Sequence, residues 1–311
     1  MRLLPALAVC LLPPAGCLAA PPEAAPAHIR IPVWAEPGGG AAGFRATLSG
    51  SASRILATKR PDDDLLLMLV LDLTQDLTQA TLAKDALVAE IHKLPPKTTV
   101  AVLRAQDTLK VLADPAPDRA RVAEAIQSLP ISGKAGLLDA VEFLGRAGDA
   151  ILKKTAVRVA ILCVTDSDIG NYRENFANPV VNSSDTRDLS RKFPEALVQE
   201  RISKLSTRLS GQQTPLFIVH LLYRAGRLNQ AYQSGLTELA ETTAGASLFC
   251  HSSAEVAGAI HHSLGMITSH YSLTLALPPR APKSVQVRIT ADPASGQKVV
   301  TYRTRLVVRG N

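Results

Sequence analysis

Two short clusters of acidic and hydroxyl side chains are the strongest candidates for chemistry in this sequence. One is Asp72-Leu73-Thr74-Gln75-Asp76, and the other is Thr165-Asp166-Ser167-Asp168. Carboxylates grouped with a hydroxyl suit a hard cation such as Mg²⁺ or Ca²⁺. The alternative is that the first cluster only caps the helix that follows it, because carboxylates are favoured at the positive N-terminal end of a helix.

Each cluster directly follows an apolar segment. Residues 65–71 and 157–164 have the pattern of strands that are covered on both faces. In an open parallel sheet, ligands bind beyond the carboxyl ends of the strands, an edge that we call the rim. If the two strands are neighbours, Asp72 and Asp166 lie close together at the rim.

The rest of the chain alternates between helix and strand patterns. Apolar spacings of three and four predict helices around 80–94, 118–129, 137–151, 198–209, 228–239 and 256–267. Further strands are predicted at 98–105, 108–112, 216–222 and 247–250, and residues 167–192 read as a long polar loop. This alternation predicts an α/β fold with a doubly wound, mainly parallel sheet flanked by helices.

The C-terminal segment has a different pattern. Residues 271–277, 284–290 and 299–308 alternate between apolar and polar side chains, which predicts a small antiparallel β appendage. Exposure of its apolar face would leave an aggregation-prone apolar surface, so we expect 269–311 to pack on the α/β domain. Arg303 and Arg305 are expected to share a solvent-facing side, which solubility and edge protection explain more simply than a polyanion site.

The N-terminal segment predicts export. A short basic start, an apolar run of about ten residues and a small-residue exit make 1–20 a secretory signal peptide. Cleavage near Ala19 or Ala20 is the simplest expectation, and the alternative is a bacterial lipoprotein signal, in which Cys17 becomes a lipid anchor. Either way, we expect an exported protein that is periplasmic, secreted or on the outer surface. Residues 21–62 are predicted to hold a linker and one or two short strands. No later apolar run reaches 18 residues, so no transmembrane span is expected.

Composition narrows the function classes. The chain has 311 residues, of which 46% are hydrophobic, and a net charge of +7. From Tyr271 onward there are seven basic residues and one acidic residue, so most of the excess charge belongs to one segment, and nucleic-acid binding is not expected.

Cys163 lies in a predicted central strand and Cys250 follows an expected edge strand, so no disulfide is predicted between them.

Several catalytic patterns are missing from the sequence. The glycines at 38–40 have no strand before them and no helix after them, so they do not form a phosphate-binding loop. No serine occupies a Gly-x-Ser-x-Gly elbow. His261 and His262 point about 100° apart on a helix and do not share a zinc ion. Asp72 and Asp76 are spaced at +4, whereas phosphatase-like α/β folds place the second aspartate at +2.

The order of the motifs resembles that of von Willebrand factor A domains over residues 63–268. The first cluster looks like the Asp-x-Ser/Thr-x-Ser metal motif of that family, and Val164-Thr165-Asp166 resembles the third motif. The second and the closing motifs are similar to Gly133-Lys134-Ala135-Gly136-Leu137-Leu138-Asp139-Ala140 and to Leu239-Ala240 with Thr243 and Gly245. With Ser269-His270-Tyr271-Ser272-Leu273, the chain also resembles the exported von Willebrand factor A-related proteins of acidobacteria.

The resemblance implies a metal-ion-dependent adhesion site with two substitutions. Thr74 matches the first hydroxyl ligand, Asp76 stands where the second serine is expected, and Ala135 occupies the threonine position. The implied metal ligands are therefore Asp72, Thr74, Asp76 and Asp166, with weak binding of Mg²⁺ or Ca²⁺. Without a cation, crowded carboxylates repel one another, and at least one is expected to have a raised pKa.

Three functional hypotheses follow from the sequence and the resemblance. The first is a non-enzymatic interaction or adhesion module that grips an acidic side chain of a protein partner at the rim. The second is a metal-dependent hydrolase that uses the same carboxylates, although no nucleophile is identified. The third is an inert envelope protein whose basic C-terminal segment contacts an anionic glycan or the envelope surface.

Overall fold

The apolar segment at 65–71 forms β5 (Leu65–Asp72), a central strand of a six-stranded sheet in the computed structural model. The structure describes residues 27–36, 43–172 and 194–308. The sheet has the order β10-β9-β8-β5-β6-β7, and only β7 is antiparallel to its neighbour. The other strands are β6 (Thr98–Arg104), β7 (Lys110–Ala116), β8 (Arg158–Thr165), β9 (Leu216–His220) and β10 (Ser247–Phe249).

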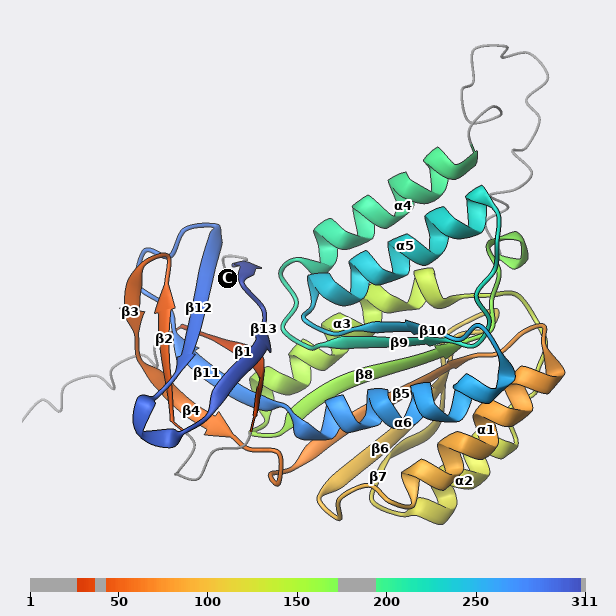
Figure 1. The fold of residues 1–311 in the computed structure, drawn as a ribbon, viewed down its shortest axis with the longest axis horizontal. Helices are drawn as coiled ribbons and strands as arrows, with labels where there is room; N and C mark the ends of the chain where they lie inside the picture. The colour runs from red at the N-terminus through yellow and green to blue at the C-terminus, as the bar shows by residue number, and fades with distance from the viewer. Residues whose placement is uncertain (1–26, 37–42, 173–193, 309–311) are drawn as a thin grey trace, which may run out of the picture.

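Helices cover both faces of this sheet, because alternate residues of the buried strands point to opposite sides. Leu67 and Leu69 of β5 pack in the layer of α1, α2 and α6, whereas Met68 and Val70 pack in the layer of α3, α4 and α5 (Figure 1). The helices are α1 (Leu77–Ile91), α2 (Arg119–Gln127), α3 (Leu137–Lys154), α4 (Pro194–Leu209), α5 (Arg227–Thr242) and α6 (Ser253–Ser269). The predicted fold class is confirmed.

Both ends of the described chain combine into one β-sandwich beside the α/β domain (Figure 1). Its two sheets have the orders β13-β1-β11-β4 and β14-β12-β2-β3. The strands are β1 (His28–Glu36), β2 (Phe44–Leu48), β3 (Ser51–Ser53), β4 (Ile55–Lys59), β11 (Tyr271–Ala276), β12 (Ser284–Ala291), β13 (Lys298–Tyr302) and β14 (Arg305–Val307). A core of its own lies between the sheets.

The sequence underestimates the N-terminal part of this sandwich. It predicts one or two short strands before residue 60, but four strands are present there, and β1 has nine residues. In β2 only Ala46 and Leu48 are buried, and no residue of β3 or β4 is buried, so few apolar residues mark these strands. β1 also pairs with β11 and β13, which lie more than 200 positions away in the sequence. The N-terminal and C-terminal β segments are thus parts of one structural unit.

Buried Arg158 and half-buried Arg30 connect the sandwich to the α/β domain. Arg158, at the start of β8, donates to the carbonyls of Asp63 and His270. Asp63 lies in the segment that leads from the sandwich into the α/β domain, and His270 lies where the chain returns to the sandwich. Arg30 of β1 donates to the carbonyl of Val157. Trp34 packs edge-on against Phe217 of β9. These contacts join β1 and His270, the residue before β11, to the α/β domain.

Arg303 corrects one sequence expectation. It does not share a solvent-facing side with Arg305, because its side chain is 4% exposed and donates to the carbonyls of Gln212 and Ser210 in the α/β domain. The reason is local, because β13 ends at Tyr302 and the chain then crosses to the other sheet, where β14 begins at Arg305. Arg303 lies between the two strands, so the rule that every second side chain of one strand points to the same face does not apply to this pair. Part of the basic charge of the tail is therefore structural.

Two further expectations concern cysteines and membranes. Cys163 in β8 and Cys250, directly after the edge strand β10, are both buried and free, as predicted. Among the described residues, no helix combines the length and the apolar character needed to cross a bilayer. Ile169–Asn171 of the predicted polar loop form a short 3₁₀ helix, and 173–193 lie outside the described residues, as does the predicted signal peptide.

Candidate functional site at the rim of the sheet

Asp72 and Asp166 lie side by side at the rim, as predicted. β5 and β8 are parallel neighbours, and Asp72 pairs in register with Thr165, the residue before Asp166. The chain connects β5 onward to β6 on one side, whereas β8 leads to β9 on the other side. The two aspartates therefore stand at the topological switch point, where open α/β sheets bind their ligands.

The Asp166 carboxylate is held by the loop that follows β5. Its Oδ1 accepts from the backbone N–H of Thr74 at 2.7 Å. Its Oδ2 accepts from the N–H groups of Gln75 at 2.9 Å and Asp76 at 2.8 Å. The Thr74 hydroxyl adds a longer bond of 3.3 Å to Oδ1. Three backbone donors and a hydroxyl thus surround this buried side chain and stabilise its charge.

The Asp72 carboxylate is also paired with protein donors. Its Oδ1 accepts from the backbone N–H of Gly136 at 3.1 Å, and its Oδ2 accepts from the Thr165 hydroxyl at 3.1 Å. A Cβ atom at position 136 would overlap the carbonyl of Ala105, so only glycine lets this N–H approach. Burial raises the pKa of Asp72 to about 6, and repulsion from Asp166 adds to the effect. The predicted raised pKa is thus present, with burial as its main cause.

Asp76 and Ala135 differ in their contribution to the rim. The Asp76 side chain caps α1 by accepting from the backbone N–H of Gln79 at 3.0 Å, which is the alternative role that the sequence left open. Ala135 is buried at the rim, where its N–H donates to the carbonyl of Asn171. Ala135 brings no hydroxyl to the threonine position of the motif.

Asn171 and Lys134 occupy the space above Thr74. The Asn171 side-chain amide donates to the Thr74 hydroxyl at 3.0 Å, and the Lys134 ammonium donates to the Asn171 amide oxygen at 3.4 Å. A resident cation would need the Thr74 oxygen as a ligand, and here that oxygen accepts a hydrogen bond from an amide.

The donor set as arranged does not fit a resident divalent cation. Both oxygens of Asp72 and of Asp166 accept hydrogen bonds from the protein, and Asp76 caps a helix. Among the residues that the structure describes, no three His, Cys, Asp or Glu side chains form a group that could hold a metal. The metal site that the resemblance implies at Asp72, Thr74, Asp76 and Asp166 is untested, and this bonding argues against it.

Beneath the rim, a chain of hydroxyl groups extends from Asp72 into the core. Thr165 lies 2.6 Å from the Ser167 hydroxyl, which lies 3.1 Å from the hydroxyl of Tyr232. Tyr232 in turn lies 2.7 Å from the hydroxyl of Tyr172. Sequence reasoning assigned Tyr232 only to the apolar face of its helix, and no local motif marks it. This network supports the buried carboxylate from below.

The solvent side of the rim carries cationic and apolar groups. We call Gln75, Leu77, Lys134, Asn171 and Arg224 the rim surface. Its polar members form two contacting pairs, since Arg224 donates to Gln75 at 3.4 Å and Lys134 donates to Asn171. Arg224 also lies 3.9 Å from the Asp168 carboxylate. Leu77 begins α1 with a 66% exposed side chain. An acidic group beside an apolar side chain would complement this surface.

Comparison with known proteins gives structural similarity only. No family model matches the chain, and no curated protein matches it. Among solved structures, it is similar to a von Willebrand factor type A protein from Catenulispora acidiphila, with 12% identity, a TM-score of 0.46, and coverage of 91% of this chain and 74% of that one.

Two further similar structures each cover about two thirds of the chain. One is the von Willebrand factor domain of the type V pili tip protein Mfa5 from Porphyromonas gingivalis, with 13% identity, a TM-score of 0.44, and coverage of 66% of this chain and 95% of that one. The other is BatB from Bacteroides thetaiotaomicron, with 14% identity, a TM-score of 0.40, and coverage of 66% and 98%.

The fold assignment rests on the topology of the chain itself. Starting at β5 and numbering in chain order, the sheet has the order 3-2-1-4-5-6 of doubly wound folds. The first and third motifs meet at its switch point, and Gly136 of the second motif binds Asp72 there. The α/β part of this chain is therefore a doubly wound α/β domain, and the motifs that resemble those of von Willebrand factor A domains meet at its switch point.

Proposed function

We propose that this chain is an exported, non-enzymatic interaction or adhesion module that binds an acidic segment of a protein partner at the rim surface. One observation carries the proposal: the switch point, where such sheets bind ligands, presents Lys134 and exposed Leu77 above carboxylates that are already hydrogen-bonded. In a metal-dependent adhesion site, a cation attracts the partner's carboxylate. Here the Lys134 ammonium supplies positive charge at that edge.

The hydrolase alternative has little support at this site. A general base or a nucleophile needs an accessible lone pair within reach of a substrate. Asp72 and Asp166 are fully buried, and their oxygens accept bonds from Gly136, Thr165 and the loop after β5. Incubation of the chain with generic phosphoesters and Mg²⁺ should give no turnover. Turnover that is lost in Asp166→Asn would favour the hydrolase.

A displayed peptide library tests binding at the rim surface. Peptides selected on the purified chain should be enriched in Asp or Glu next to an apolar residue, and their binding should persist in EDTA. Lys134→Glu and Leu77→Ser should each weaken this binding by about tenfold, the effect of removing one central contact of about 1.4 kcal/mol.

Matched controls come from exposed residues outside the rim surface. Lys153→Glu on α3 and Leu82→Ser on α1 make the same chemical changes at exposed positions. They should leave binding unchanged. Selected peptides that bind the rim variants as well as the wild type, or that EDTA releases, would contradict the proposal.

Export is tested separately on the N-terminal segment. Expression of the full chain in a bacterial host and sequencing of the mature N-terminus should show cleavage near residue 20, or a lipid-modified Cys17. A chain that keeps Met1 and stays in the cytoplasm would contradict the export part of the proposal and leave the rim surface to be judged by its own experiment.

A further inference from the structure

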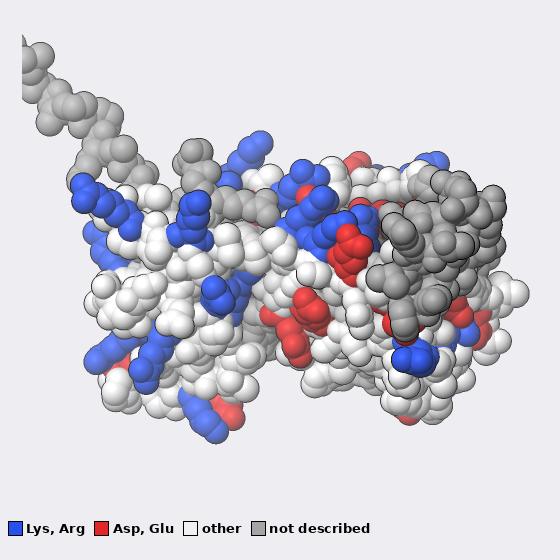
Figure 2. Space-filling model, turned by 90° about the horizontal axis from the view of Figure 1, so that it is seen from above, with Lys and Arg blue, Asp and Glu red and all other residues white. Residues whose placement is uncertain are grey.

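Positive charge is concentrated on the β-sandwich. Its described residues, 27–36, 43–60 and 270–308, include eleven Lys and Arg but only Glu36 and Asp292 as acids. The whole chain carries +7, so the rest of the protein has no net positive charge. Figure 2 shows that blue side chains far outnumber red ones over the sandwich half of this face. A single-sign field on one unit attracts an anionic partner.

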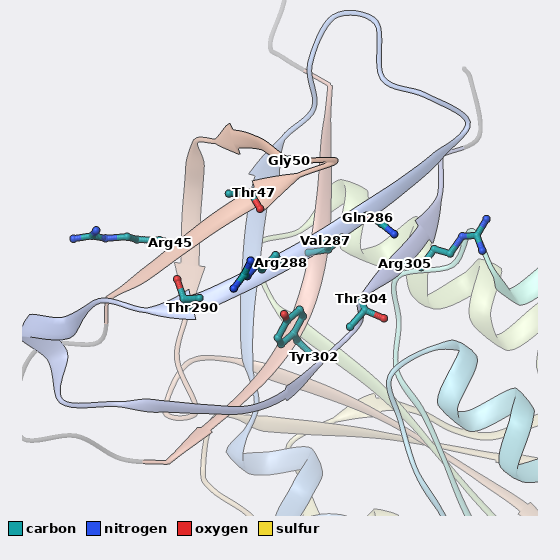
Figure 3. Close-up of a pocket in the computed structure, with 10 residues that line it drawn as sticks. All are labelled: Arg45, Thr47, Gly50, Gln286, Val287, Arg288, Thr290, Tyr302, Thr304 and Arg305. Carbon is teal, nitrogen blue, oxygen red and sulfur yellow. The ribbon is translucent and has the colours of Figure 1, made fainter.

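Three exposed arginines form a diagonal row on the outer face of one sandwich sheet. Arg305 of β14 stands opposite Gln286 of β12, and Arg288 lies two positions further along β12. Arg45 of β2 stands opposite Thr290, again two positions further. Such diagonal neighbours have Cα atoms about 7–8 Å apart. Figure 3 shows Arg288 between Arg45 and Arg305, whose guanidinium groups extend to opposite sides.

The same face is hollowed into a groove of about 800 Å³. Besides the arginines, hydroxyl and amide side chains line it, among them Thr47, Thr290, Tyr302 and Gln286 (Figure 3). No acidic residue is among the described residues that line it. The groove therefore combines separated cations with groups that hydrogen-bond to neutral hydroxyls.

The arginines of this row remain available to a ligand. Arg288 makes no hydrogen bond or ion pair with the described residues. Arg305 donates through Nε to Ser284, which leaves its two terminal nitrogens for other acceptors. Arg45 meets Asp292 at 3.5 Å, and both side chains are well exposed, so this ion pair is weak and exchangeable.

We propose that this groove binds an acidic polysaccharide, in which carboxylates recur along a chain of hydroxyl-bearing sugars. Guanidinium groups bind carboxylates through two parallel hydrogen bonds, and the threonine and glutamine side chains suit the sugar hydroxyls. Single-stranded nucleic acid fits less well, because it is bound on successive aromatic rings and Tyr302 is the only aromatic residue among the described residues that line the groove. The groove belongs to the sandwich, so this site is independent of the rim surface.

Binding of polygalacturonate to the immobilised full chain tests the proposal, with neutral dextran and oligo(dT) as comparison ligands. Polygalacturonate should bind in a salt-sensitive manner, and dextran should not bind. The triple variant Arg45→Gln/Arg288→Gln/Arg305→Gln should lose about tenfold in affinity, from three exposed charge contacts. All three residues are exposed, and a melting curve verifies folding. If the triple variant does not fold, Arg288→Gln alone should weaken binding about twofold.

The matched control removes the same charge elsewhere on the sandwich. Arg54→Gln/Arg280→Gln/Lys283→Gln changes three exposed basic residues that do not line the groove. It should change the affinity for polygalacturonate by less than about threefold, because screened surface charges contribute little individually. Equal losses in the two triple variants, tighter binding of oligo(dT) than of polygalacturonate, or no binding of polygalacturonate would each overturn the proposal.

Discussion

Replacement of Asp72 by asparagine should stabilise the protein at neutral pH. Burial raises the pKa of this carboxyl to about 6 from an ordinary value of 3.8. The difference corresponds to about 3 kcal/mol against the charged form, at about 1.4 kcal/mol per pH unit. Asparagine keeps an oxygen to accept from the Gly136 N–H and carries no charge. A hydrogen-bond mismatch with Thr165 would subtract a constant amount at every pH.

The pH dependence isolates the charge from such constant effects. The folded protein holds a proton on Asp72 between about pH 4 and pH 6, where the unfolded chain has lost it, so the free energy of unfolding falls as pH rises through this window. The stability of Asp72→Asn relative to wild type should therefore increase by about 1.4 kcal/mol from about pH 5 to about pH 8. His220 and His270, whose pKa values burial lowers to about 4 and about 3, destabilise both proteins equally in acid, so their effects cancel in this difference.

Urea denaturation followed by the fluorescence of Trp34, the only tryptophan of the chain, measures this difference. Asp114→Asn at an exposed position of β7 controls for the loss of one negative charge, and its stability relative to wild type should not change with pH. A relative stability of Asp72→Asn that is flat between these pH values would refute the reasoning.

Three other predictions concern the sandwich and the cysteines. Arg303→Met should lower the free energy of unfolding by about 2–4 kcal/mol in urea denaturation, because buried carbonyls lose their donor, whereas Arg305→Met at an exposed position should change it by less than about 0.5 kcal/mol. A chain that ends at His270 should aggregate in light scattering or melt several degrees lower, because β11 lies between β1 and β4; unchanged solubility and melting would contradict the packing. Thiol titration of the denatured, non-reduced mature protein should find Cys163 and Cys250 free, and finding neither would contradict the strand order.

The sequence predicts the α/β domain well because its signals are local. The apolar segment at 65–71 is buried on both faces of a central strand, and helical spacing identifies α1 and α6 directly. The proximity of Asp72 and Asp166 follows from one rule about parallel sheets. The sandwich is harder to predict, because β1 pairs with strands from the other end of the chain, and such long-range pairing leaves no local signal in the sequence.

The bonding of the candidate site could not be predicted from residue types. Backbone N–H groups of the loop after β5 hold Asp166, and backbone donors leave no mark in a sequence. Asn171 and Tyr232 reach the site from distant segments. Asp76 could equally be a ligand or a helix cap by its type and position, and only the direction of its side chain toward Gln79 separates the two roles.

A thermal-shift series on the wild type and Asp76→Ala, with EDTA, Mg²⁺ or Ca²⁺, tests most directly whether protein donors and not a cation hold the rim carboxylates. We predict no rise in the wild-type melting temperature with either ion. Asp76→Ala should be destabilised by about 1 kcal/mol, as expected for a lost helix cap. A cation bound with a Kd of about 1 mM would, at about 10 mM, stabilise the wild type by about 1.4 kcal/mol. Two results together would contradict the account. One is a saturable, cation-dependent stabilisation of the wild type by about this amount, with no such response in Asp76→Ala. The other is an Asp76→Ala variant that is more stable than the wild type when no cation is present.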